Sequence, residues 1–190
     1  PRLRGDEVAR PDLAQALIAA VLTARAAAVG VTTGLVGAGG FGKTTLARMV
    51  AHDPRIRAHF IGGVVWVTVG EEAAGPDLAS KLVSTARLFD AAAADVNDPL
   101  AAGGVLARAL ADRTVLLVID DVWTSEQVEP FLIGGERVVR LFTTRQHGVL
   151  PVGAARVRVD QMAETEAREL LTAGLPVLPA GLVADALRMT

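Results

Sequence analysis

The chain has 190 residues, 51% of them hydrophobic, and a net charge of −2 from 19 basic and 21 acidic side chains. Such a length allows one α/β domain, or one domain plus part of a second, with a sizeable core. The sequence has no run of basic residues, which disfavours nucleic-acid binding. It also has no uninterrupted apolar stretch of about 18 residues, so we expect no membrane span. The chain has no cysteine, which excludes disulfides and thiolate metal sites and suits a cytoplasmic protein.

Segments with strand patterns alternate with segments with helical patterns along the chain, which predicts a sheet of parallel strands covered by helices on both faces. In chain order the patterns predict a helix at 12–27, strands within 29–37 and 62–70 separated by a helix at 43–51, helices at 77–89 and 98–112, a strand at 114–120, a short helix near 125–130, strands at 137–142 and 156–159, and helices at 164–172 and 179–189. The last helix has no stop signal, so we expect this chain to be part of a longer protein. Ligands of such sheets bind at the carboxyl ends of the strands.

The strongest motif is "GAGGFGKTT", residues 37–45, which fits the phosphate-binding pattern G-x-x-x-x-G-K-[ST] through Gly37, Gly42, Lys43 and Thr44. Its glycines let backbone N–H groups surround a phosphate chain, and the N-terminus of the following helix favours negative charge. Lys43 is expected to reach the β- and γ-phosphates, and the Thr44 hydroxyl is expected to ligate Mg²⁺.

A second motif, "VLLVIDD" at 115–121, is an apolar run that ends in two aspartates. A buried strand should not end in paired carboxylates unless a cation offsets their charge. Mg²⁺ at Thr44 is such a cation, with Asp120 as a direct or water-mediated ligand. Asp121 is then expected to polarise an attacking water.

With "LFTTR" at 141–145, these motifs resemble the NB-ARC nucleotide-binding domain of the STAND class, shared by plant disease-resistance proteins, the apoptotic protease-activating factor and bacterial regulators. The resemblance implies an α/β P-loop NTPase fold: three αβα layers around a five-stranded parallel sheet of order 2-3-4-1-5, followed by the start of a small helical domain. It divides the chain into an adenine-contacting segment and helix (1–30), a P-loop core (31–160) and the beginning of a helical lid (161–190).

The same resemblance implies a set of site residues. The catalytic residues are Lys43, Asp120, Asp121 and Arg145, and Thr44 and Asp120 are the metal ligands. The nucleotide-binding residues are Val8, Ala9, Arg10, Gly37, Gly39, Gly40, Phe41, Gly42, Lys43, Thr44, Thr45, Thr144 and Arg145. The family commonly has glycine before the arginine of the adenine segment, where this chain has Ala9.

By resemblance, the strand of "LFTTR" lies between the P-loop strand and the "LLVIDD" strand, so its end faces the γ-phosphate. Thr143 or Thr144 is then expected to bind the attacking water or a Mg²⁺-bound water, and Arg145 to donate to a γ-phosphate oxygen. Trp66 and Trp123 are interpreted as core or domain-contact residues. For Arg137 and Arg140 we expect solvated charges beside the strand, with a trans-acting role in an assembled ring as the alternative.

The function implied by the resemblance is an ATP/ADP-binding switch that uses Mg²⁺, hydrolyses ATP slowly, and couples the nucleotide to conformational change and self-association in the full-length protein. Sensor and effector domains are expected outside this chain. Two alternatives stay open: a turnover P-loop enzyme, either a kinase or an ATP-driven motor, and a nucleotide-binding scaffold without hydrolysis.

Overall fold

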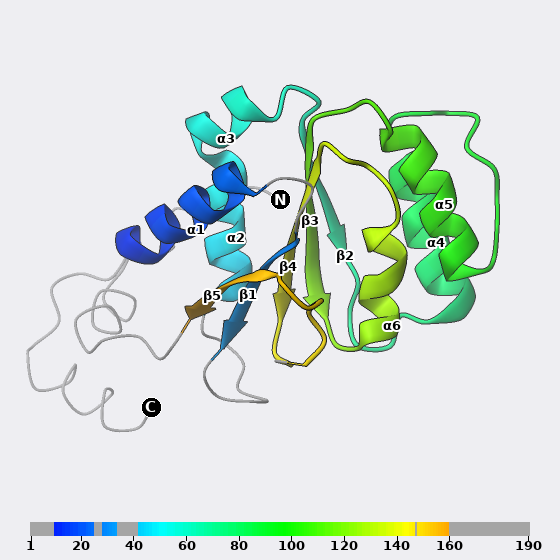
Figure 1. Ribbon diagram of the computed structural model, residues 1–190. Helices are drawn as coiled ribbons and strands as arrows, with labels where there is room; N and C mark the ends of the chain where they lie inside the picture. Colours follow the sequence, from blue (N-terminus) through cyan, green and yellow to red (C-terminus); the bar gives the residue numbers. More distant parts are fainter. Residues whose placement is uncertain (1–9, 25–27, 34–41, 147, 160–190) are drawn as a thin grey trace, which may run out of the picture.

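The computed structural model describes residues 10–24, 28–33, 42–146 and 148–159, which form one sheet with helices on both of its faces (Figure 1). All strand pairs are parallel, and the order across the sheet is β2-β3-β4-β1-β5. The strands are β1 (Ala28–Thr33), β2 (Val64–Thr68), β3 (Val115–Val122), β4 (Val138–Thr144) and β5 (Ala155–Val159). This is the predicted strand order, and it places the carboxyl ends of β1, β3 and β4 side by side.

The two central strands, β3 and β4, are almost entirely buried. Every residue of β4 is buried, and Asp121 is the one residue of β3 that is not. Burial on both faces explains why these segments read as continuous apolar runs rather than as alternating ones. The polar residues at the carboxyl ends of β3 and β4 therefore lie where the buried core meets the edge of the sheet.

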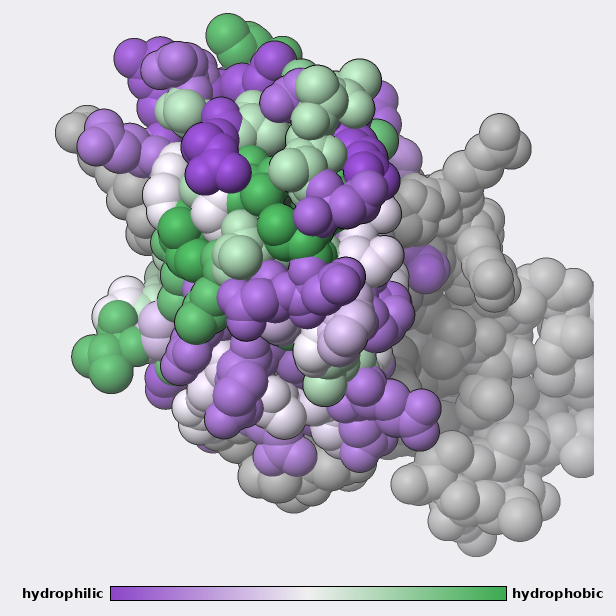
Figure 2. Space-filling view, turned by 90° about the vertical axis from the view of Figure 1, so that its right-hand side faces the viewer, coloured by the Kyte–Doolittle hydropathy of each residue, from purple (hydrophilic) through white to green (hydrophobic). Residues whose placement is uncertain are grey.

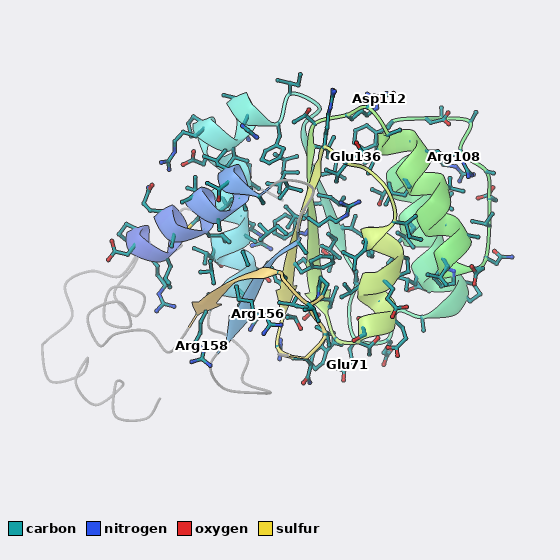
Figure 3. The ribbon with its side chains drawn as sticks, viewed as in Figure 1. Glu71, Arg108, Asp112, Glu136, Arg156 and Arg158 are labelled. Carbon is teal, nitrogen blue, oxygen red and sulfur yellow. The ribbon has the colours of Figure 1, made fainter. Side chains whose placement is uncertain are left out.

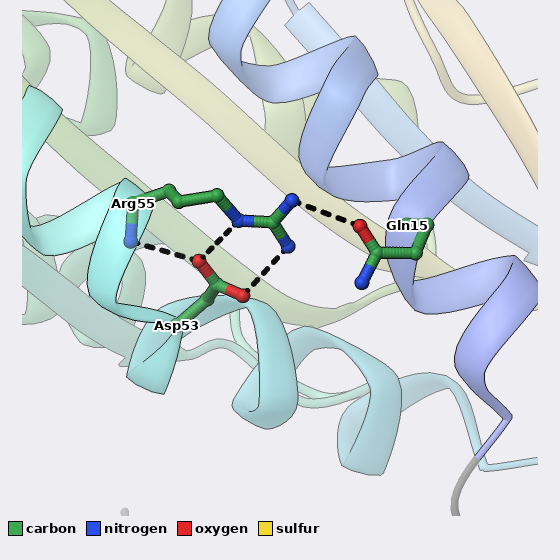
Figure 4. Close-up of polar contacts among 3 residues, drawn as sticks. All are labelled: Gln15, Asp53 and Arg55. Carbon is green, nitrogen blue, oxygen red and sulfur yellow. Dashed lines mark hydrogen bonds and ion pairs between the residues drawn. The ribbon is translucent and has the colours of Figure 1, made fainter.

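One face of the sheet is covered by α1 (Pro11–Thr23), α2 (Lys43–His52) and α3 (Pro54–His59) (Figure 1). The pattern predicted α1 and α2 but not α3, which is too short to show a helical period. Asp53 caps α3 by accepting from the backbone N–H of Arg55 at 2.8 Å. The Arg55 side chain also donates to Gln15 of α1 at 2.9 Å (Figure 4). Ile56 and Phe60 add α3 to the apolar core on this face.

The other face carries α4 (Gly75–Ala86), α5 (Pro99–Leu110), α6 (Ser125–Val128) and the 3₁₀ helix η1 (Glu129–Leu132). The outer side of this layer faces the viewer in Figure 2, where apolar side chains gather between polar ones. None of the helices in the described residues is long and apolar enough to cross a membrane. The helices predicted at 164–172 and 179–189, and with them the lid, lie outside the described residues.

The prediction that Arg140 is a solvated charge is wrong. Its side chain is only 4% exposed, and its guanidinium donates to the carbonyls of Phe131 at 2.6 Å and Val138 at 3.0 Å, and to that of Gly134. Arg140 therefore fastens the turn between η1 and β4 to the strand. Burial of this kind also excludes the alternative role as a finger that reaches into a neighbouring subunit. Arg137, by contrast, is exposed as predicted.

Candidate functional site

The amino end of α2 is built by a glycine in a left-handed conformation. Gly42 precedes the helix with φ 78°, which favours a residue without a side chain, and its carbonyl accepts from Leu46 N–H at 2.7 Å. Lys43 is the first residue of α2 and is buried. Desolvation lowers the pKa of Lys43, and the nearby positive charge of Arg145 lowers it further, while Asp121 and Asp120 raise it. The four charged side chains therefore share one region.

Asp120 joins three elements at the carboxyl end of the sheet. Its Oδ1 accepts from the hydroxyl of Thr44 on α2 at 2.9 Å and from the hydroxyl of Thr143 on β4 at 2.6 Å. Thr44 lies 76 positions before Asp120 in the chain, and Thr143 lies 23 positions after it. Thr44 and Asp120, the two predicted Mg²⁺ ligands, thus lie side by side, and their role as ligands stays a prediction.

Asp121 adopts an unusual backbone conformation for its residue type. Its φ is 59°, and the pairing register of β3 with β4 shifts between Ile119 and Val122. The Asp121 N–H donates to the Thr143 hydroxyl at 2.9 Å, and its carbonyl accepts from Gly70 N–H at 3.1 Å. Aspartate tolerates this region better than most residues, and such local strain gathers at functional sites. The irregularity leaves Asp121 as the partly exposed residue of β3.

Thr143 lies at the end of β4 as the sequence suggested, but its hydroxyl has a role that the sequence did not show. We expected Thr143 or Thr144 to contact water, but the Thr143 hydroxyl binds both aspartates, through the side chain of one and the backbone of the other. The Thr144 hydroxyl instead accepts from the backbone N–H of Gln146 at 3.0 Å. The predicted contact of Thr144 with nucleotide stays a prediction.

Gln127 of α6 is a structural residue of the site that sequence reasoning missed. It is 3% exposed, and its Nε2 donates to the carbonyls of Gly70 at 2.9 Å and Ala73 at 3.0 Å in the loop after β2. Its Oε1 accepts from the backbone N–H of Trp123 at 2.8 Å. A capping box, with Thr124 as the first residue, fixes the start of α6. The spacing Thr-x-x-Gln was the available signal.

Arg145 follows β4 directly, and its guanidinium carbon lies over the ring of Trp123, 5.2 Å from the ring centroid. Trp123 follows β3, the neighbouring strand. The two residues therefore meet at the same edge of the sheet as Asp120. In Figure 3, Glu71 of the loop after β2 lies at this edge, whereas Asp112 and Glu136 lie at the opposite one.

Part of the predicted site lies outside the described residues: Val8, Ala9, Gly37, Gly39, Gly40 and Phe41. Arg10 is the residue before α1, and Thr45 lies in the first turn of α2. The adenine contact and most of the phosphate loop therefore stay predictions.

The donor set at Thr44 and Asp120 fits Mg²⁺. This ion usually takes one or two protein oxygens and completes its shell with waters and substrate phosphates. Within the described ranges no cluster of three or more His, Asp or Glu side chains forms a cation site made of protein alone. The site offers one hydroxyl and one carboxylate oxygen, 2.9 Å apart. This small number of protein oxygens suits a metal ion whose other ligands are waters and substrate phosphates.

Comparison with known proteins assigns the family. The model of the NB-ARC domain matches residues 15–174. The chain belongs to the NB-ARC family. It is therefore a nucleotide-binding P-loop domain of the STAND class, as the resemblance implied.

Relatives of this NB-ARC domain include proteins much longer than this chain. It is 36% identical over 163 residues to the regulatory protein AfsR of Streptomyces coelicolor, covering 85% of this chain and 16% of the relative. It is also 38% identical over 90 residues to a probable disease resistance RPP8-like protein of Arabidopsis thaliana, covering 47% of this chain and 10% of the relative. The chain thus spans a small part of these relatives.

The solved structure of a STAND protein with a tetratricopeptide repeat sensor, from Pyrococcus horikoshii, shares the fold of the NB-ARC domain. The TM-score is 0.63 at 17% identity, with all of this chain and 28% of that chain covered. The ORC2 protein of Aeropyrum pernix, solved as ADPNP–ADP complexes, gives a TM-score of 0.54 at 17% identity over 91% of this chain and 52% of that chain.

Proposed function

We propose that this NB-ARC domain binds ADP or ATP with Mg²⁺ and is the nucleotide-dependent switch of a STAND signal-transduction protein, with slow ATP hydrolysis. The observation that carries the proposal is the convergence of Thr44, Asp120 and Thr143 at the end of the sheet where α2 begins. Three elements far apart in the chain supply these groups. The same region holds two cations, Lys43 and Arg145, whose mutual repulsion an anionic ligand would relieve.

The residues have separate tasks in this proposal. The backbone of residues 37–42 and the side chain of Lys43 bind the phosphates, while Thr44 and Asp120 hold Mg²⁺, whose charge offsets that of the phosphates. Thr143 keeps Asp120 in place, and Asp121 orients the attacking water. Residues 1–30 contact adenine through Val8, Ala9 and Arg10, and residues 161–190 begin the helical lid that follows the core at 31–160.

Arg145 is the residue proposed to distinguish ATP from ADP. A charge-assisted hydrogen bond to a γ-phosphate oxygen contributes roughly 1.5–3 kcal/mol, which favours ATP by about 10- to 150-fold. A complete two-state switch from 1:99 to 99:1 needs about 5.5 kcal/mol. The remainder would come from contacts with lid and further domains, so this chain alone should bind nucleotide without a large cooperative change in shape.

The partners proposed for the whole protein are the nucleotide, further copies of itself in an oligomer, and sensor and effector domains outside this chain. We propose a cytoplasmic location. Multidomain relatives such as AfsR, of which this chain matches 16%, support the presence of further domains.

Calorimetric titration of Mg–ATP and Mg–ADP into the wild-type chain and Arg145→Ala tests the sensor role. The variant should weaken ATP binding by about 10- to 150-fold and change ADP binding little. Arg137→Ala, which removes an exposed arginine at the other end of β4, is the matched control and should leave both affinities unchanged. Equal losses for the two nucleotides with Arg145→Ala would refute the sensor role.

Phosphate release under Mg–ATP separates the remaining functions. Release of many phosphates per second would identify an enzyme such as a kinase or motor. Release of a few phosphates per hour would identify the proposed switch. Asp121→Asn should abolish slow release and keep nucleotide binding, because asparagine also tolerates a positive φ. If wild type and Asp121→Asn are equally inactive, the domain is a scaffold without hydrolysis.

A further inference from the structure

Arg145 is placed by a contact with an aromatic ring rather than with a carboxylate. Its guanidinium carbon is 5.2 Å from the centroid of the Trp123 ring, inside the range in which a cation is attracted to an aromatic face. Among the described residues Arg145 forms no ion pair. The face of Trp123 is therefore the aromatic group in contact with its charge.

The backbone that carries the ring is held by Gln127. The backbone N–H of Trp123 donates to Oε1 of Gln127 at 2.8 Å, and Gln127 is buried and bonded to the loop after β2. Trp123 is half-buried at the end of β3, one residue beyond the strand. Trp123 therefore lies at the same edge of the sheet as Asp120, three residues along the chain.

Arg145 lies in a region that holds charges of both signs. Arg145 lies close enough to the buried Lys43 for its positive charge to lower the pKa of that lysine, second to the effect of burial. Asp121 and Asp120 offset part of the repulsion between the two cations, and the contact with the ring adds an attraction that acts on the guanidinium itself before an anion arrives. A carboxylate partner would neutralise the guanidinium, whereas a ring leaves its charge and most of its five N–H donors for a phosphate.

We propose that Trp123 is a positioning residue for nucleotide discrimination, whose indole face holds Arg145 at the phosphate-binding end of α2 with its donors available for a γ-phosphate. This inference rests on the proposed function of Arg145 as the group that recognises ATP. Without the ring, Arg145 samples other directions before binding, and only the part of its ensemble that faces the site contributes to ATP affinity.

The test measures the affinities of Mg–ATP and Mg–ADP by calorimetry for Trp123→Leu, Trp123→Phe, Arg145→Ala and the double variant Trp123→Leu/Arg145→Ala. Trp123→Leu should lower the preference for ATP by about three- to tenfold, the range expected for a lost cation–ring contact. Trp123→Phe keeps an aromatic face and should retain most of the preference. In the Arg145→Ala background, Trp123→Leu should change the ratio no further, because its effect passes through Arg145.

The outcomes separate this inference from the function on which it rests. If Arg145→Ala lowers the ATP preference and Trp123→Leu leaves it unchanged or raises it, the positioning role is wrong and the sensor role survives. The positioning role is also wrong if Trp123→Leu has the same effect with and without Arg145. If Arg145→Ala weakens ATP and ADP equally, the sensor role itself fails.

Fluorescence gives a second measurement that does not depend on Trp123→Leu being folded. The chain has two tryptophans, so Trp66→Phe leaves Trp123 as the one indole emitter. In that background Arg145→Ala should shift the emission of Trp123, and the control Arg137→Ala should not. An emission spectrum that is identical with and without Arg145 would show that the ring and the guanidinium do not meet.

Discussion

Thr143→Val removes a hydroxyl with almost no change in side-chain shape, and so isolates the bonds that hold the two aspartates. In the structure this hydroxyl donates to Asp120 Oδ1 at 2.6 Å and accepts from Asp121 N–H at 2.9 Å. Thr143 is 2% exposed, so no water can easily replace it. Valine also suits a strand, so the change should not disturb β4 itself.

The magnitude follows from the two bonds. A hydrogen bond to a charged carboxylate contributes about 1.5–3 kcal/mol, and an amide N–H left without a partner at a partly buried position costs roughly 1 kcal/mol more. We expect Thr143→Val to lower the free energy of unfolding by about 2–4 kcal/mol. Loss of the group that orients a metal ligand typically weakens metal binding by about 10- to 100-fold, so the Mg²⁺ dependence of ATP binding should shift by that factor.

Two assays check these effects: urea unfolding for stability, and ATP titration at a series of Mg²⁺ concentrations for the metal. Thr143→Ser keeps the hydroxyl and should retain the Mg²⁺ dependence. Thr85→Val makes the same change in α4, where the buried hydroxyl donates to the carbonyl of Lys81 at 2.7 Å, and should leave Mg²⁺ affinity unaltered. An unchanged Mg²⁺ dependence in Thr143→Val, with a loss of stability below about 0.5 kcal/mol, would refute the reasoning.

Gln127→Glu keeps the size of the side chain but replaces its NH₂ group by an oxygen that faces three carbonyls. Urea unfolding should show that the free energy of unfolding falls by roughly 2–4 kcal/mol. The loss should be smaller at acidic pH, where the new carboxyl is protonated and can donate. Arg140→Lys cannot reach all the carbonyls that the guanidinium fork binds, and should lose a similar roughly 2–4 kcal/mol, whereas a change below about 0.5 kcal/mol would show that the fork is dispensable. The hydrogen bond from Arg55 lowers the pKa of Asp53 below its ordinary 3.8, so this pair stabilises the fold above that pH and its contribution is lost as the pH falls through the lowered pKa. Asp53→Asn keeps the cap, and thermal unfolding should show a small loss of stability at pH 7, because Arg55 is exposed and solvent screens its charge, and none in strong acid.

Many features of the site were predictable because they arise from local pattern. A glycine-rich turn before a helix, and two aspartates at the end of an apolar run, indicate the phosphate end of a parallel sheet without knowledge of which strands are neighbours. The family resemblance supplied the strand order, which the structure bears out. The two motifs assigned Thr44 and Asp120 to one Mg²⁺ site, and in the structure their oxygens are 2.9 Å apart.

Other features depended on contacts that a sequence does not display. Arg140 looks like a charge at the flank of a strand, but the carbonyls of the turn between η1 and β4 surround it. Helix α3 has six residues, which is too few to show a period, and the capping by Asp53 and the burial of Ile56 and Phe60 stabilise it.

The amino-acid sequence by itself determined the fold class, the family and the end of the sheet at which the nucleotide is expected. Each of these depends on residues that are neighbours in the chain, whose spacing directly sets helix, strand or turn. Only the tertiary structure decided that Thr143 binds both aspartates, that Gln127 fastens two loops, and that the ring of Trp123 lies beneath Arg145. Those contacts join residues up to 57 positions apart, and they exist only once strand order, register and the irregularity at Asp121 have brought the ends of separate strands together.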